Sequence, residues 1–134
     1  MAKARPLRIE VKRAYDPPAQ ADGQRVLVDR VWPRGVTKDA LRLDAWVKEL
    51  APSTGLRKWF AHDAARWDGF RERYFRELDA QPEAVATLLD RCARGRLTLV
   101  YGAKDTAHNN AIALKAYLVK VARERREPDR KEAP

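Results

Sequence analysis

Apolar residues recur along this chain with two different periods. Apolar and charged residues alternate over 7–11, which predicts a half-buried strand. Short apolar runs at 26–28 and 97–101 end in turn residues, so each predicts a buried strand. Between these runs the apolar residues are three and four apart, which predicts helices over roughly 39–94. The same spacing returns after the third strand and predicts a last helix.

The helical patterns carry their own start and stop signals. The spacing over 43–50 predicts a first helix that stops before the next proline. Ser53 and Asp63 are the expected N-caps of the next two helices, because their side-chain oxygens accept hydrogen bonds from free backbone N–H groups. Pro82 suits the first position of the fourth helix, and Gly95 suits the residue that stops it.

Strands that alternate with helices predict a single domain of the α/β class. We expect a small three-layer sandwich, with a short, mainly parallel sheet and flanking helices. The domain is predicted to cover residues 1–122. Residues 123–134 have no apolar face and are predicted to form a disordered, charged tail. The loop over 16–24 leaves the direction of the first strand open, either parallel or antiparallel to the others.

Composition narrows the class of protein. The single cysteine, Cys92, excludes an internal disulfide, and its place on an apolar helical stripe indicates an inert core residue. The N-terminus has no apolar segment of signal-peptide length. No run approaches the roughly 20 apolar residues that a membrane span needs. We therefore expect a cytoplasmic protein with no membrane partner.

The formal net charge of +9 raises the question of nucleic-acid binding. Residues 1–13 carry five basic and one acidic side chain, and residues 120–134 carry six basic and four acidic ones. The excess therefore lies mainly at the two ends, where it attracts polyanions without forming a shaped binding surface. Charge alone favours a well-solvated exterior over specific nucleic-acid binding.

Polar side chains gather directly after the second and third predicted strands. Ligands of open α/β sheets bind just beyond the carboxyl ends of the strands, so these side chains form the expected site. Parallel strands would bring both groups to one edge of the sheet. The candidates are Asp29, Arg30, Trp32 and Arg34 after the second strand, and Lys104, Asp105, His108, Asn109 and Asn110 after the third.

Several of these side chains suit the binding of an anionic, planar molecule. Arg30 and Arg34 are suited to bidentate contacts with the anionic group. Lys104 and Asn109 are expected beside them as further ligand-binding residues, and Trp32 is expected to stack on a planar part of the ligand. The alternatives are an ion pair between Arg30 and a neighbouring carboxylate, and packing of Trp32 around the turn that follows it.

Catalysis at this edge would need an acid or a base within reach of the ligand. Asp29, Asp105 and His108 are the candidates, because strand-end carboxylates readily acquire shifted pKa values. For Asp105 the alternative is helix capping. Asp105 and His108 could share a helix face, but two ligands without a third do not define a metal site. The chain has no glycine-rich phosphate loop, and we expect neither a metal nor a cofactor.

Long stretches of the chain resemble the YeaO-like bacterial proteins, within the broader domain of unknown function 488. These stretches are YDPP (15–18), DGQRVLVDRVWPRGVTKD (22–39), LDAWVKELAPS (43–53), LRKWFAHD (56–63) and LVYGAKDTAHNNA (99–111). The resemblance implies a compact α/β protein with a site at the strand ends. The wider group tends to carry a strand-end Asp-x-Arg and a Cys-His-Arg segment on the last strand. This chain has adjacent Asp29 and Arg30 and an Asn-Asn-Ala segment at 109–111, so thiol or metal chemistry does not carry over.

Two main functional hypotheses are consistent with these features. The first is a protein whose anion-accepting pocket acts on a nucleotide-like or other phosphorylated small molecule. A hydrolase, or an enzyme that cleaves a glycosidic bond, would fit such a site. The alternative is a non-catalytic nucleic-acid-binding accessory protein that uses the basic ends and Arg71, Arg73 and Arg76 on an exposed helix face. A domain that binds a protein partner is a third interpretation, and the sequence leaves the substrate and the oligomeric state open.

Overall fold

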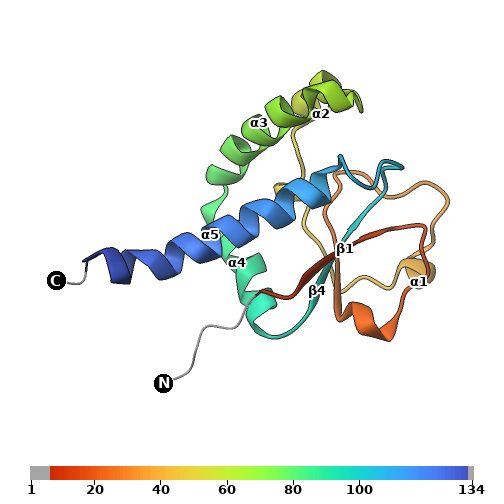
Figure 1. The fold of residues 1–134 in the computed structure, drawn as a ribbon. Helices are drawn as coiled ribbons and strands as arrows, with labels where there is room; N and C mark the ends of the chain where they lie inside the picture. The colour runs from red at the N-terminus through yellow and green to blue at the C-terminus, as the bar shows by residue number, and fades with distance from the viewer. Residues whose placement is uncertain (1–6, 133–134) are drawn as a thin grey trace.

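A computed structural model describes residues 7–132, with side chains from residue 7 to residue 125. Figure 1 shows a small sheet with helices packed beside it and a long C-terminal helix. The strands are β1 (Ile9–Arg13), β2 (Gln24–Leu27), β3 (Ala45–Trp46) and β4 (Leu97–Tyr101). The helices are α1 (Lys38–Leu41), α2 (Thr54–Phe60), α3 (Trp67–Asp79), α4 (Pro82–Ala93) and α5 (Asn110–Glu132), with short 3-10 turns η1 (Gln20–Asp22), η2 (Lys48–Leu50) and η3 (Ala64–Arg66).

The four strands are all parallel and lie in the order β1-β4-β2-β3. The predicted α/β fold with a parallel sheet is confirmed, and β1, whose direction the sequence left open, runs parallel to β4. β4 lies between β1 and β2 and is buried along its whole length, which explains its nearly continuous apolar run. Because the strands are parallel, their carboxyl ends open on one edge of the sheet.

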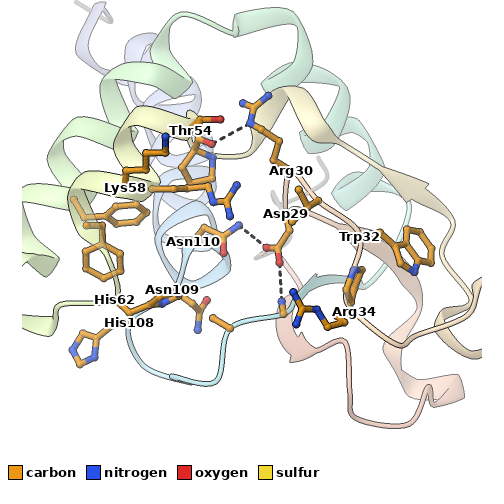
Figure 2. Close-up of a pocket in the computed structure, with 18 of the residues that line it drawn as sticks. Asp29, Arg30, Trp32, Arg34, Thr54, Lys58, His62, His108, Asn109 and Asn110 are labelled. Carbon is orange, nitrogen blue, oxygen red and sulfur yellow. Dashed lines mark hydrogen bonds between the residues drawn. The ribbon is translucent and has the colours of Figure 1, made fainter.

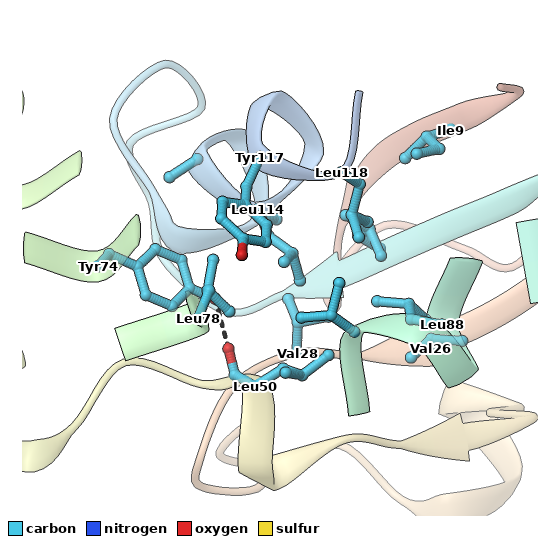
Figure 3. Packing of buried hydrophobic residues seen from close by; sticks show 14 of the residues in the cluster. Ile9, Val26, Val28, Leu50, Tyr74, Leu78, Leu88, Leu114, Tyr117 and Leu118 are labelled. Atoms are coloured by element: carbon cyan, nitrogen blue, oxygen red, sulfur yellow. Dashed lines mark hydrogen bonds between the residues drawn. The ribbon is translucent and has the colours of Figure 1, made fainter. Parts of the chain in front are cut away.

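Apolar side chains pack on both faces of the sheet. Figure 3 shows the larger cluster, in which side chains from α3, α4 and α5 meet those of β1 and β2. Its members include Ile9, Val26, Val28, Tyr74, Leu78, Leu88, Leu114 and Leu118. The smaller cluster lies around Leu27 and Val100, and it is covered by Leu41 of α1 together with Trp32 and Trp46. These two clusters and the sheet between them make the three layers.

The predicted helix over 43–50 is wrong. Helix α1 ends at Leu41, because Arg42 adopts a left-handed conformation with φ of 49°. The chain then pairs with the edge of the sheet, where the Asp44 backbone N–H donates to the Arg25 carbonyl at 2.7 Å. Pairing with β2 thus replaces the helical hydrogen bonds that the apolar spacing favoured, and β3 and η2 form in place of the helix.

The other helix signals are confirmed. The Ser53 hydroxyl accepts a hydrogen bond from the Leu56 backbone N–H at 3.1 Å and caps α2. The Asp63 carboxylate accepts from the Ala65 backbone N–H at 3.0 Å and caps η3, which leads directly into α3. Pro82 is the first residue of α4, as expected for a residue that lacks a backbone N–H.

Helix α5 extends farther than the apolar pattern indicated. Its backbone is helical from Asn110 to Glu132, whereas the sequence predicted a disordered tail from residue 123. Side chains beyond residue 125, and residues 133–134 altogether, lie outside the described part, so the division into a domain and a tail stays a prediction. Within the described residues, no helix combines the length and the apolar character needed to cross a membrane.

A buried ion pair joins η1 to β2. The Arg25 guanidinium, 4% exposed, donates to the Asp22 carboxylate at 2.6 Å and to the Leu41 carbonyl at 2.9 Å. Burial raises the pKa of Asp22, but hydrogen bonds from the Ala19 N–H, Lys12 and Arg25 outweigh it and hold this pKa below its ordinary value. The ionised pair therefore ties the loop before β2 to the sheet.

We expect Arg25→Ala to lower the free energy of unfolding by about 3 kcal/mol, because it leaves the buried Asp22 carboxylate without its guanidinium. Arg76→Ala is the matched control, since it removes the exposed pair between Arg76 and Glu72 and should cost about 1 kcal/mol or less. Urea denaturation followed by tryptophan fluorescence measures both losses. Equal losses would contradict a structural role for the buried pair.

Candidate functional site

A cavity of about 710 Å³ opens at the carboxyl edge of the sheet. Its walls are the segment over 29–34, helix α2, the turn after β4 and the start of α5 (Figure 2). A cavity of this size matches the range found for small-molecule sites, about 300–1,000 Å³. It lies where the parallel topology predicts a ligand site. We call it the rim pocket.

The carboxyl group of Asp29 lies at the centre of the rim pocket (Figure 2). One oxygen accepts a hydrogen bond from the Asn110 side-chain amide at 3.0 Å, and the other accepts from the Gly102 backbone N–H at 2.8 Å. Burial raises the pKa of Asp29 above its ordinary value, although these two hydrogen bonds and the charge of Arg57 act in the opposite direction. Two hydrogen bonds therefore fix the position of the Asp29 carboxyl group, and burial removes part of its contact with water.

Cationic side chains outnumber this carboxylate. Arg30, Arg34, Arg57 and Lys58 line the rim pocket, and Asp29 is the one acidic side chain among the described residues that line it. The Arg30 guanidinium makes two long contacts, of 3.3 and 3.4 Å, with backbone carbonyls of residues 51 and 52. It does not pair with its neighbour Asp29. The pocket therefore carries an excess of positive charge.

Two hydrogen bonds hold the segment that carries Arg30 and Arg34. The Tyr15 hydroxyl donates to the Arg34 carbonyl at 3.0 Å, and the Trp32 indole N–H donates to the Val36 carbonyl at 2.5 Å. The Trp32 ring meets Trp46 edge to face, with centroids 5.4 Å apart. Figure 2 shows Trp32 directed away from Asp29, so its ring packs the smaller core even though the residue borders the pocket.

The second predicted group of residues divides at the start of α5. His108 and Asn109 line the rim pocket, whereas Lys104 and Asp105 do not. The Asp105 carboxylate accepts from the backbone N–H groups of residues 107 and 108, both at 2.9 Å, and contacts the His108 ring nitrogen Nδ1 at 3.0 Å. These bonds lower the pKa of Asp105. The buried Asn109 amide donates to the backbone carbonyl of residue 105 and accepts from the backbone N–H of residue 112.

Comparison with known proteins places the chain in a family. A model of the family described as the inactive DUF488-N3 subclade matches residues 8–134. The chain belongs to the YeaO-like DUF488 family. It is 46% identical to the uncharacterized protein YeaO of Escherichia coli K12 over 112 residues, 84% of this chain and 97% of that protein. It is 41% identical to the uncharacterized protein Rv3073c of Mycobacterium tuberculosis over 110 residues, 82% of this chain and 92% of that protein. No solved structure matches it.

Helix α2 supplies pocket residues that the sequence analysis of this DUF488 chain missed. Arg57 and Lys58 line the rim pocket from the exposed side of α2, whose Leu56 and Phe60 are buried. His62 reaches the pocket from the turn after α2, where it has a left-handed φ of 57°. That conformation is uncommon for a residue other than glycine. The LRKWFAHD stretch contains these three residues, but only the packing of α2 beside the sheet edge shows that their side chains line the pocket.

The raised pKa of Asp29 has a measurable consequence. A carboxyl group whose folded pKa is raised makes folding less favourable as pH rises from its unfolded pKa through its folded pKa. The free energy of unfolding of the wild type, minus that of Asp29→Asn, should therefore fall with rising pH in the interval above the ordinary aspartate value. Urea denaturation of both proteins from about pH 3 to about pH 7 measures this difference.

Arg57→Gln provides a second measurement on the same carboxyl group. Its loss of charge should raise the pKa of Asp29 further, because Arg57 lowers that pKa in the wild type. Arg94→Gln, an exposed change outside the pocket lining, should leave the pKa unchanged. Carbon-13 NMR of the Asp29 carboxyl gives the pKa directly. A wild-type pKa at or below that of an ordinary aspartate would contradict the conclusion that burial raises the pKa of Asp29.

Proposed function

We propose that this protein binds a small phosphorylated molecule in the rim pocket and holds it without transforming it. The observation that carries the proposal is the imbalance of charge, with four cationic side chains around one carboxylate. None of these four forms an ion pair among residues 7–125. Cations that lack an internal counter-charge favour an anion from outside the protein.

The types of side chain favour phosphate over an unspecific anion. Arginine presents a planar fork of N–H donors that matches two oxygens of one phosphate group. Arg34 and Arg57 are exposed, and Arg30 makes only the long contacts with backbone carbonyls. These three guanidinium groups are therefore able to turn toward a bound phosphate at small cost.

Other observations support binding without catalysis. The matching family model is described as an inactive subclade. The one cysteine, Cys92, is buried in the larger core cluster, and burial raises its pKa to about 11, which disfavours a thiolate nucleophile. Both oxygens of Asp29 already accept hydrogen bonds within the protein. This arrangement suits a carboxylate that positions the pocket walls.

A hydrolase is the second candidate, and the raised pKa of Asp29 is the observation that favours it. A carboxyl group shifted in this direction, inside a cavity, is better able to exchange a proton near neutral pH. Incubation of the protein with a phosphate ester or a nucleoside, followed by product analysis, separates the candidates. If the wild type hydrolyses one of these compounds and Asp29→Asn does not, the hydrolase hypothesis would replace the proposal of binding without catalysis.

Nucleic-acid binding through α3 has less support. Arg73 stacks over the ring of Trp59 from α2 at 3.9 Å, whereas Arg71 lies 5.8 Å from the ring of Phe75. Arg76 is paired with Glu72. The three arginines of the sequence hypothesis are thus engaged with different neighbours within the protein. They do not form one free basic stripe.

Titration with ribose 5-phosphate tests the proposal. Isothermal calorimetry should detect binding to the wild type, and Arg57→Gln should weaken it about tenfold, because a charge-assisted hydrogen bond to phosphate is lost. The control Arg94→Gln should bind like the wild type. Asp29→Asn should bind more tightly than the wild type, since it removes the negative charge closest to the cations.

Two results would overturn the anion site. One is the absence of binding by ribose 5-phosphate and by inorganic phosphate at millimolar concentration. The other is equal weakening by Arg57→Gln and Arg94→Gln, which would indicate a diffuse effect of net charge. Circular dichroism of each variant excludes unfolding as the cause. Both substituted arginines are exposed, so neither change should disturb the core.

A further inference from the structure

The walls of the rim pocket differ in chemistry from one side to the other. Figure 2 shows Arg30 above Asp29 and Arg34 below it, whereas Lys58, His62 and His108 lie to its left. Phe60 and Phe70 also line the cavity. Arg30 and Arg34 therefore line a different part of the pocket from the planar rings, and Lys58 lies on the side of the histidines.

The rings are packed against one another and form a rigid wall. The centroids of Phe60 and Phe70 are 4.5 Å apart, and Trp67 stacks on Phe70 with an interplanar angle of 18°. The His108 ring meets Trp67 edge to face at 5.3 Å, and the Asp105 carboxylate holds its Nδ1 atom. Rings fixed in this way lose little conformational entropy when a planar ligand packs on them.

We infer that the ligand is a nucleoside monophosphate, whose base packs on the ring wall while its phosphate lies among the cations. The inference rests on the proposed function, because it assumes that the rim pocket binds phosphate. A sugar phosphate would leave the exposed His62 ring and the partly exposed His108 ring without a contact, and a nucleoside without phosphate would leave the guanidinium groups unmatched. A mononucleotide matches both parts of the cavity at once, and the volume of about 710 Å³ accommodates it.

His62 is the ring best placed to contact the base. It is exposed, its side chain makes no hydrogen bond with another described residue, and its ring lies 6.4 Å from that of Phe60. Two consecutive residues in the left-handed region, Ala61 and His62, bring it to the pocket. Histidine rings stack on nucleobases as other aromatic side chains do.

Calorimetry with adenosine monophosphate, ribose 5-phosphate and adenosine tests the inference. The monophosphate should bind about tenfold more tightly than ribose 5-phosphate, as expected for one stacked base. His62→Asn, which tolerates the left-handed backbone, should reduce this preference to about twofold or less, whereas His62→Phe should retain most of it. Arg57→Gln should weaken the binding of both phosphates equally, because it removes a phosphate contact that they share and leaves the base contact of the monophosphate intact.

The outcomes separate this inference from the proposed function. Equal affinity for adenosine monophosphate and ribose 5-phosphate would overturn the base contact and leave the phosphate site intact. No binding of either compound would overturn both. A preference that His62→Asn leaves unchanged would also overturn the inference. Tighter binding of a short oligonucleotide, lost at high salt and insensitive to His62→Asn, would indicate a polyanion surface instead of a mononucleotide pocket.

Discussion

The carboxyl group of Asp29, just past β2, binds two positions that lie 73 and 81 residues later in the chain. It accepts hydrogen bonds from the backbone after β4, at Gly102, and from the first residue of α5, Asn110. Asn110 also donates to the carbonyl of Val28, just past β2. A side chain at residue 102 would place its Cβ 3.2 Å from an oxygen of Asp29, so glycine permits the close approach. This connection needs parallel strands, because only then do the ends of β2 and β4 meet the start of the following helix.

Local patterns predicted the elements whose hydrogen bonds are local or whose burial is complete. Helices α2 to α5 follow from apolar spacing and from caps such as Ser53, and β4 follows from its apolar run. The helix predicted over 43–50 does not form, because the first apolar residues there pack against the sheet in an extended segment. Leu43, just before the edge strand β3, and Trp46, within it, pack on the smaller cluster. The partner of that strand, β2, lies about twenty residues earlier in the chain. A pairing of this kind leaves no periodic signal in so short a segment.

Only the residues of the candidate site that follow strand ends could be predicted from the sequence. Parallel topology brings Asp29, Arg30 and Arg34 to the same cavity as His108 and Asn109. Two residues that the sequence analysis added, Lys104 and Asp105, lie outside the lining, because the turn before α5 uses the Asp105 carboxylate to bind its own backbone. The contribution of α2 depends on how that helix packs beside the sheet. Helical periodicity identifies the exposed side of α2 but cannot identify what that side faces.

The chain uses the same kinds of charged side chain in opposite ways at the two ends of β2. Before the strand, Asp22 lies between Lys12 and Arg25 at hydrogen-bond distance, so both cations share one carboxylate within the fold. Beyond the strand, Asp29 accepts hydrogen bonds from Asn110 and from a backbone N–H. The guanidinium groups near it form no ion pair among the described residues. Compensation is what a structural pair requires, since a buried unpaired ion is costly. A partly open cavity can retain uncompensated charge because water solvates it. The difference in compensation, more than the number of charges, distinguishes the rim pocket from the buried pair.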